Sequence, residues 1–344
     1  MRRLLRFLIV LLVVFAVLVI AGGVYARSQI RASLPVLNGE ASIPGLEAAV
    51  RIDRDALGVP TIAGGSREDV ALALGFVHAQ DRFFQMDLQR RQPAGELAAL
   101  VGPRALVVDE EIRVHRLRDV AHRALERTSP SYRRVLEAYA DGVNAGLNGL
   151  GAVPPEYLVL RATPEPWRPE DTVLTVLAMF NTLQGRQALF EQTIGAMRDA
   201  LPEPLFRFLS ANGSEWDTPV VGGPQVRPPV PGPEVIDLRK SDRQATEARR
   251  HGVDFVNSRK TEREFCFLCD SASPWLVRDP DADAIIGSNN WAVDGAHTAS
   301  GVALVANDMH LTIGVPIIWY RASLAFPDVD GAPQKITGIT LPGL

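Results

Sequence analysis

The sequence has little cysteine and little excess charge. Cys266 and Cys269 are its only two cysteines, and one Cys-Phe-Leu-Cys pair lacks the four ligands of a structural zinc site. The pair lies in a charged, irregular stretch, so we interpret it as a local disulfide or as two free thiols. A formal net charge of −4 provides no basic patch for a nucleic acid. Both absences argue against a zinc-binding or nucleic-acid-binding module.

Three common hydrolase signatures are also absent. The sequence contains no Gly-x-Ser-x-Gly elbow, no Ser-x-x-Lys and no His-Glu-x-x-His. A serine or zinc hydrolase of those conventional types is therefore not supported. With 344 residues, 47% of them hydrophobic, the chain is nevertheless large enough to bury a substantial core.

The first 26 residues differ in composition from the rest. Three arginines in the first six residues precede an uncharged apolar run over residues 7–24, and small residues follow. This pattern predicts either a cleaved export signal or a retained membrane anchor over residues 1–26. A buried core helix is the remaining alternative. Since the basic end stays inside, both favoured interpretations place the remainder in the periplasm or outside the cell.

Local signals predict several elements after this segment. Residues 47–63 have the composition of strands around a Gly-Val-Pro turn. A capping box at Ser66-Arg67-Glu68-Asp69 predicts the start of a helix. Prolines at first helical positions predict two more helix starts, at Pro130 and Pro169. The apolar run at 173–183 is dense enough to predict burial.

Two adjacent segments predict a break in the fold. Residues 218–233 are rich in proline and glycine, and residues 234–265 are highly charged with weak periodicity. Neither composition suits a helix or a central strand. We interpret them together as a spacer, with a long surface loop as the alternative.

A hairpin with unusual chemistry is predicted near residue 288. Strand-like residues 289–293 and 302–306 flank a turn, and Gly287-Ser288 opens the first strand. If the peptide bond before Ser288 breaks, one residue gains a hydroxyl and an α-amine with a reference pKa near 7.7–8.0. That amine can accept the hydroxyl proton. Gly287, which lacks a Cβ, tolerates the strained backbone that such a self-cleavage needs.

Motifs that carry a family resemblance occur in order along the chain: Asp53-Arg54-Asp55-Ala56-Leu57-Gly58-Val59-Pro60, then residues 75–86, Arg90-Arg91, Gly95-Glu96-Leu97, Pro154-Pro155-Glu156-Tyr157 and residues 165–171, and finally residues 287–293, 298–301 and 306–311. From about residue 47 to the last residue, the spacer excepted, the chain resembles the penicillin acylase family of N-terminal-nucleophile hydrolases. Several ordered motifs agree, which makes the resemblance specific.

The resemblance implies a fold and a maturation. The expected fold is α+β, a four-layer αββα sandwich that is incomplete in this chain and preceded by an N-terminal hydrophobic helix. Residues 27–222 are expected to be the mostly helical smaller-chain region. Residues 223–287 are expected to be a spacer removed on maturation, and residues 288–344 the start of the larger catalytic chain. The smaller and larger chains would remain partners after processing.

The resemblance also implies an activity. The expected enzyme cleaves a linear acyl amide, of the penicillin or acyl-homoserine-lactone type, through an acyl-Ser288 intermediate. The alternative is a non-catalytic, membrane-anchored remnant of such an acylase. Family members continue for several hundred residues beyond this point and carry their oxyanion donors there. We therefore expect residues 1–344 alone to be inactive.

The site residues implied for catalysis and substrate binding fall into two groups. Ser288 is the expected nucleophile and processing residue, with Gly287 before the cut and His310 flanking the site. Phe180, Leu183 and Leu311 are candidates for the acyl pocket, with core packing as the alternative for each.

No cofactor is expected for catalysis. Glu191 is the candidate ligand of one structural calcium, with a solvated charge as the alternative. Trp291 is expected in the core, and His78, His115 and His122 are interpreted as packed structural residues. Asn289 is expected to orient the neighbouring strand, and Asn307 and Asp308 to form a structural turn.

Overall fold

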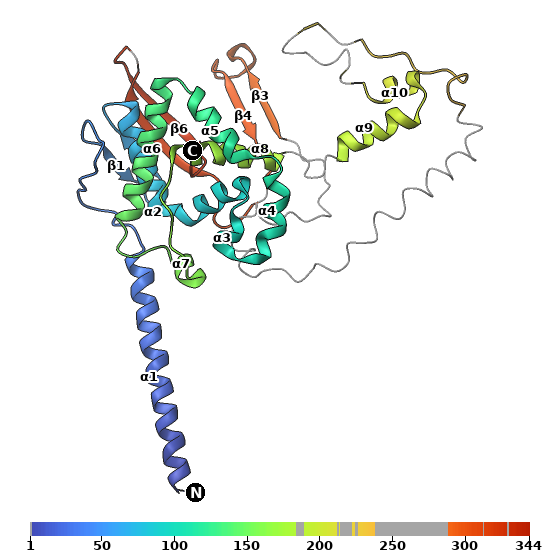
Figure 1. Cartoon of the computed structure of the whole chain (residues 1–344). Helices are drawn as coiled ribbons and strands as arrows, with labels where there is room; N and C mark the ends of the chain where they lie inside the picture. Colours follow the sequence, from blue (N-terminus) through green and yellow to red (C-terminus); the bar gives the residue numbers. More distant parts are fainter. Residues whose placement is uncertain are drawn as a thin grey trace. The chain divides into compact units, whose positions relative to one another are not determined.

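The computed structural model describes residues 2–183, 189–211, 213, 222–223, 226–237, 288–311, 313–328 and 330–344 (Figure 1). The chain divides into two compact units, residues 1–181 with 268–344 and residues 182–267. Gly287, Cys266, Cys269 and most of the predicted spacer lie outside the described residues.

Helices dominate the region before the spacer. Its helices are α1 (Arg2–Ala32), α2 (Arg67–Ala94), α3 (Leu97–Val101), the 3₁₀ turn η1 (Pro103–Ala105), α4 (Leu106–Arg113), α5 (Leu117–Arg127), α6 (Pro130–Asn148), α7 (Pro155–Leu160) and α8 (Pro169–Leu183). The second unit contains α9 (Leu189–Ala200) and α10 (Glu203–Leu209).

The strands come from both sides of the predicted spacer. They are β1 (Arg51–Arg54), β2 (Pro60–Ala63), β3 (Asn289–Val293), β4 (Leu304–Asp308), β5 (Tyr320–Pro327) and β6 (Pro333–Thr340). One sheet has the order β1-β2-β5-β6, and β3 and β4 form a separate pair. Only β2 and β5 pair in parallel among the described strands, with Thr61 opposite Ser323. Helices and a largely antiparallel sheet confirm the expected α+β class.

The predicted helix starts are confirmed. The Ser66 hydroxyl caps α2 by accepting the N–H of Asp69 at 3.0 Å, as the capping box predicts. α6 begins at Pro130 and α8 at Pro169. These signals succeed because a cap or a first-turn proline acts within a few residues of itself.

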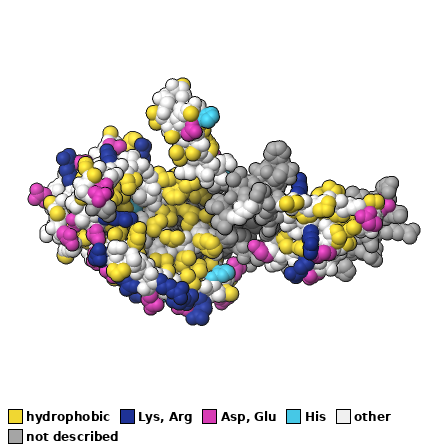
Figure 2. Space-filling model, turned by 90° about the horizontal axis from the view of Figure 1, so that it is seen from above, with side chains coloured by type: hydrophobic (Ala, Val, Ile, Leu, Met, Phe, Trp, Pro, Cys, Tyr) yellow, Lys and Arg dark blue, Asp and Glu magenta, His cyan; other side chains and the backbone are white. Residues whose placement is uncertain are grey.

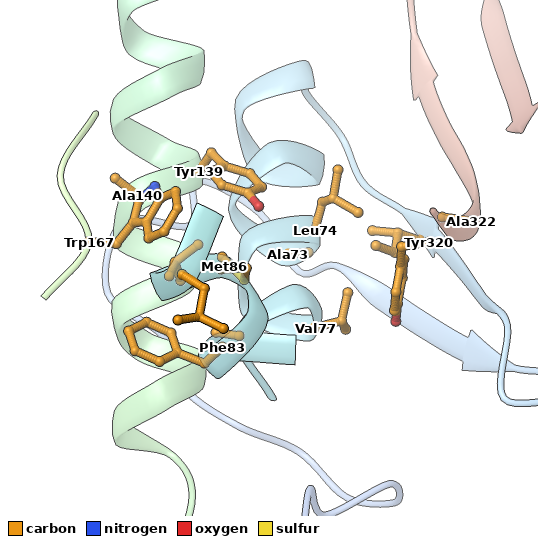
Figure 3. Packing of buried hydrophobic residues seen from close by; sticks show 14 of the residues in the cluster. Ala73, Leu74, Val77, Phe83, Met86, Tyr139, Ala140, Trp167, Tyr320 and Ala322 are labelled. Carbon is orange, nitrogen blue, oxygen red and sulfur yellow. The ribbon is translucent and has the colours of Figure 1, made fainter. Parts of the chain in front are cut away.

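Helices α2 and α6 pack closely because glycines remove side chains from their contact. A Cβ on Gly142 of α6 would collide with the carbonyl oxygen of Leu72, and one on Gly75 of α2 with that of Tyr139. Figure 3 shows large core side chains between and beside these helices, with Tyr320 of β5 on the far side of α2. The core therefore joins α2 and α6 to a strand that comes after the spacer.

A buried ionic cluster fixes the middle of α2. Asp87, which is fully buried, accepts from Arg90 Nε at 2.8 Å and Arg91 Nε at 2.9 Å through one oxygen. Its other oxygen accepts the Tyr157 hydroxyl at 2.7 Å. Arg90 also donates to Asp171 of α8 at 2.7 Å. Within this cluster, each buried charged side chain therefore has a partner of opposite charge, which offsets the loss of its hydration in the protein interior.

The packed role predicted for His78 is confirmed by a one-way chain of hydrogen bonds. Gly343 N–H donates to the Tyr139 hydroxyl at 2.9 Å, and the Thr340 hydroxyl donates to the Tyr320 carbonyl at 3.1 Å. Tyr139 therefore donates to His78 Nδ1 at 2.7 Å, and His78 Nε2–H donates to Thr340 at 2.9 Å. This direction requires a neutral imidazole protonated on Nε2.

Two burial predictions are wrong. The run at 173–183 is buried on one face only, with Leu174 and Ala178 inside and Val176 and Phe180 exposed, because α8 covers the core with a single stripe. His115, in the turn after α4, and His122, on α5, are exposed as well, so neither is packed in the core.

Replacing Asp87 with asparagine is expected to destabilise the fold by about 3–5 kcal/mol, because it leaves two buried guanidinium groups short of a counter-charge. The matched control is Asp53→Asn, which removes an exposed pair with Arg51 and should cost less than about 1 kcal/mol. Urea unfolding of the full chain measures both. Equal losses of unfolding free energy in the two variants would show that the Asp87 cluster stabilises the fold no more than an exposed ion pair does.

Acid is expected to weaken the fold through His78. Burial, helped by the nearby Arg82 charge, lowers the pKa of His78 from 6.5 to about 3. Between those values the unfolded chain binds a proton that the folded chain does not. The contribution of neutral His78 to the free energy of unfolding is therefore complete above pH 6.5. It falls by about 1.4 kcal/mol for each pH unit as the pH drops toward the pKa of the folded state.

The measurement is the unfolding free energy between pH 7 and pH 5 in wild type and His78→Gln. The wild type should lose more stability with acid than the variant. A second measurement is the imidazole NMR signal of His78, which should stay neutral at pH 5. Parallel pH slopes together with a protonated signal at pH 5 would refute this assignment.

Candidate active site

The predicted hairpin around residue 288 is confirmed. β3 and β4 pair antiparallel, with Asn289 opposite Asp308, and the return strand begins two residues later than expected (Figure 1). The connection is a 3₁₀ turn, Gly295–His297, capped by the Asp294 carboxylate, which accepts the N–H of Ala296 at 2.8 Å. This register brings the start of β3, and hence Ser288 just before it, to the same end of the hairpin as residues 308–311.

His310 has two polar neighbours at that end. Its Nε2 lies 2.9 Å from a carboxylate oxygen of Asp308 and 3.3 Å from the amide nitrogen of Asn289. A single nitrogen cannot both donate to Asp308 and accept from Asn289. The shorter contact to a carboxylate is the stronger one, so Nε2 carries the proton. In the neutral form of the imidazole, the lone pair is then on Nδ1.

The cluster is open to solvent. The side chains of His310 and Asp308 are 48% and 68% exposed, and Ser288 is exposed as well. An ion pair this exposed contributes about 0–1 kcal/mol. Its value lies in the orientation it gives the imidazole rather than in stability.

Trp291, expected in the core, is 53% exposed, and that prediction is wrong. Within the residues that the structure describes, β3 and β4 pair only with each other, and four of the five residues of each strand are exposed, so no further layer covers the hairpin there. Figure 2 shows hydrophobic side chains gathered over the face of the molecule seen from above. Apolar surface on a hairpin and on this face is surface that a further layer of protein can cover.

The predicted pocket residues lie on α8 and just past β4. Phe180 and Leu183 are three residues apart on α8 and are 58% and 53% exposed. Leu311 lies just past β4 and is half-buried. Phe180 and Leu183 are therefore exposed in the structure rather than packed in its core, and their assignment to an acyl pocket stays a prediction. Leu183 belongs to the second unit.

Sequence reasoning missed a small cavity of about 10 Å³ between α2 and α8. It is lined by Gln89, Gln92, Thr175, Ala178, Met179, Ile318 and Leu341. Gln89 is buried, and its carbonyl oxygen has no hydrogen-bond partner within the described chain. The space suits about one water molecule. The sequence does contain a signal for this cavity. Gln85, Gln89 and Gln92 put three amides on one face of α2, and all three are buried with the apolar residues around them.

Glu191 lies on α9 and is exposed. Among the described residues, no group of three or more His, Cys, Asp or Glu side chains is arranged to hold a metal. Glu191 as a calcium ligand therefore stays a prediction.

Comparison with known proteins settles the family. The chain belongs to the penicillin amidase family, which matches residues 49–344. It is 32% identical over 321 residues to penicillin acylase 2 proenzyme of Pseudomonas sp. (strain SE83), covering 92% of this chain and 37% of that protein. It is 32% identical over 316 residues to acyl-homoserine lactone acylase QuiP of Pseudomonas aeruginosa, covering 91% of this chain and 33% of that protein.

A solved structure is also similar. Thermostable penicillin G acylase from Alcaligenes faecalis shares 30% sequence identity with a TM-score of 0.43, covering 52% of this chain and 98% of the other. The family resemblance found in the sequence is confirmed by the family match. The chain spans 37% and 33% of the length of the two curated relatives above.

Phe180→Ala is expected to change the unfolding free energy by no more than about 0.5 kcal/mol, because this side chain is exposed. The control is Leu174→Ala on the buried face of the same helix, which should cost about 2–5 kcal/mol. Urea unfolding compares the two. A large loss for Phe180→Ala would assign that residue to core packing and remove it from the candidate pocket.

Proposed function

We propose that the whole protein is a self-processing acylase in which Ser288 is the nucleophile. The observation that carries this proposal is the hairpin start: Ser288 precedes β3, and the paired strand returns His310 and Asp308 to the same end. Family membership supplies the class of reaction, because the relatives are named as acylases of penicillin and of acyl-homoserine lactones.

The proposed maturation begins with the Ser288 hydroxyl. Its oxygen attacks the Gly287 carbonyl carbon, the Gly287–Ser288 C–N bond breaks, and an ester to Ser288 forms. Water then hydrolyses that ester, which leaves a carboxylate on Gly287 and a free α-amine on Ser288. An α-amine with an ordinary pKa near 7.7–8.0 is partly neutral at physiological pH and can act as the base.

Substrate turnover uses the same chemistry. The α-amine accepts the Ser288 hydroxyl proton, the oxygen attacks the amide carbonyl, and the proton passes to the departing amine. The acyl-Ser288 ester is then hydrolysed by water. His310, with Nε2–H held by Asp308, orients this end of the hairpin. The donors for the developing oxyanion, which typically contribute about 10²–10³ in rate each, are proposed to lie outside the described residues.

Contacts across the proposed cut support this maturation. β2 precedes the spacer and β5 comes after it, yet they are hydrogen-bonded neighbours in one sheet. His78 bonds to Thr340, and Arg54 with Asp81 bonds to Tyr320. These contacts hold the two sides together without the spacer, so its loss need not separate the chains.

The remaining predictions for the whole protein are part of the same proposal. The complete fold is the four-layer αββα sandwich, the protein is exported or anchored through residues 1–26, and one calcium with Glu191 among its ligands is present. The substrate is a linear acyl amide of the penicillin or acyl-homoserine-lactone type. A non-catalytic remnant is the alternative, and replacing Ser288 distinguishes the two.

The test uses Ser288→Ala in the complete protein, with Ser300→Ala in the exposed hairpin connection as matched control. The Ser288 variant should remain one uncut chain and hydrolyse none of a panel of phenylacetyl, glutaryl and long-chain acyl amides. The control should be cut before Ser288 and keep its activity. Persistent scission and hydrolysis in Ser288→Ala would end the proposal, and a wild type that neither cuts nor hydrolyses would favour the remnant.

A further inference from the structure

The N-terminal helix is longer than its apolar run. α1 is continuous over 31 residues, and its most apolar window has a mean hydropathy of 3.2 with none of it buried. At 1.5 Å per residue the helix is about 46 Å long, against about 30 Å for the hydrocarbon core of a bilayer. Length and composition suit both a spanning anchor and an export signal, so the choice depends on how the residues after the apolar run are held.

The last turn of α1 is fastened to the folded body. The Ala32 carbonyl accepts the N–H of Ala152, which lies just after α6, at 3.2 Å. The next residue after α1, Ser33, is buried. A Cβ on Gly151 would lie 3.1 Å from that same carbonyl oxygen, which shows how close the two segments are. The contact lies at the last turn of α1 itself, before the irregular segment 33–50 that leads to β1.

The candidate cleavage residues at 24–26 lie inside this continuous helix. Proteolytic nicking concentrates in exposed irregular segments, and this one is regular. From residue 7 to residue 32 the helix is about 39 Å long, against about 35–38 Å for the hydrocarbon core together with the headgroup layer of one leaflet. A body fastened at Ala32 would therefore lie at the outer edge of the headgroups.

Exposed apolar side chains lie in the two chain segments that follow the point of attachment. Leu34, Val36 and Leu37 come directly after α1, and Leu158 and Val159 lie on α7, which begins three residues after Ala152. Val36 is 79% exposed and Val159 is 66% exposed. We call these five residues the attachment rim. Apolar side chains at headgroup depth are stabilised by the interface, whereas in water they are left uncovered.

We propose that α1 is retained as a membrane anchor and that the attachment rim rests on the outer surface of the bilayer. The occupant of the rim is lipid, because the rim is continuous with the spanning helix. Arg27 and Arg31, in the last turns of α1, lie at the depth of anionic headgroups and add electrostatic attraction. The proposal does not depend on the chemistry of Ser288, so failure of the acylase leaves it standing.

The first experiment asks whether α1 is retained. The full chain is expressed in a bacterium with an export pathway, and the product is fractionated, washed with alkaline carbonate and analysed by intact mass. The expected product keeps α1 and stays in the membrane pellet. A soluble product that begins near Arg27 would overturn the proposal.

The second experiment tests the rim by spin labelling. Single cysteines replace Val36 or Val159 in a background with Cys266→Ser and Cys269→Ser. Ser131→Cys is the matched control, because it is exposed at the other end of α6, about 25 Å along the helix from the attachment point. The chains are reconstituted in vesicles of phosphatidylcholine and phosphatidylglycerol.

On vesicle reconstitution, labels at 36 and 159 should lose accessibility to a nickel chelate while remaining accessible to oxygen. The label at 131 should stay open to nickel. If the labels at 36 and 159 are as accessible to nickel as the label at 131, the proposal that the attachment rim contacts lipid is wrong.

Discussion

The parallel pairing of β2 with β5 is the constraint on which the rest of the first unit depends. It places a strand from before the spacer beside one from after it, in a single sheet. α2 then covers that sheet, and the neutral imidazole of His78 ties the helix to Thr340. Both sides of the proposed cut thus contribute to one core, and the connecting chain is not what holds them together.

The hydrogen bonds that His78 makes at the centre of the core also fix its protonation state. His78 accepts from Tyr139 and donates to Thr340, and each of those hydroxyls is committed to a second partner. A charged imidazole would direct Nδ1–H at the Tyr139 hydroxyl, which already accepts from Gly343, and would leave the hydroxyl proton without its acceptor on His78. Burial and hydrogen-bond direction therefore favour the same neutral form.

Local features of the fold could be predicted from the sequence because their causes are local. The Ser66 cap, the helix starts at Pro130 and Pro169, and the hairpin after Ser288 each depend on residues a few positions apart. The pairing of β2 with β5 could not be predicted, since no local signal selects a partner more than 250 positions away.

Longer-range contacts explain the other misses. The Asp87 cluster depends on Tyr157 and Asp171, which reach α2 only when the chain has folded. Trp291 was misjudged because hydrophobicity predicts burial but does not supply the layer that would cover the residue.

The sequence predicts which residues form the candidate site better than it predicts the hydrogen bonds between them. The family motifs predict Ser288 and His310, but not the carboxylate of Asp308 on the imidazole, because Asp308 is expected in a turn and instead ends β4. Gln89 was overlooked because a glutamine in a long helix is usually solvated, and here it faces a cavity. The exposure of Ser288 and His310 means that water exclusion at the site needs cover from residues other than those described.

The central claim is that two chains remain one body after the bond before Ser288 breaks. The most direct test is mass spectrometry of the complete wild-type protein, under native and under denaturing conditions. The account predicts one native particle that denatures into two chains, the larger beginning with Ser288. A single intact chain with amide hydrolase activity, or two chains that separate under native conditions, would contradict it.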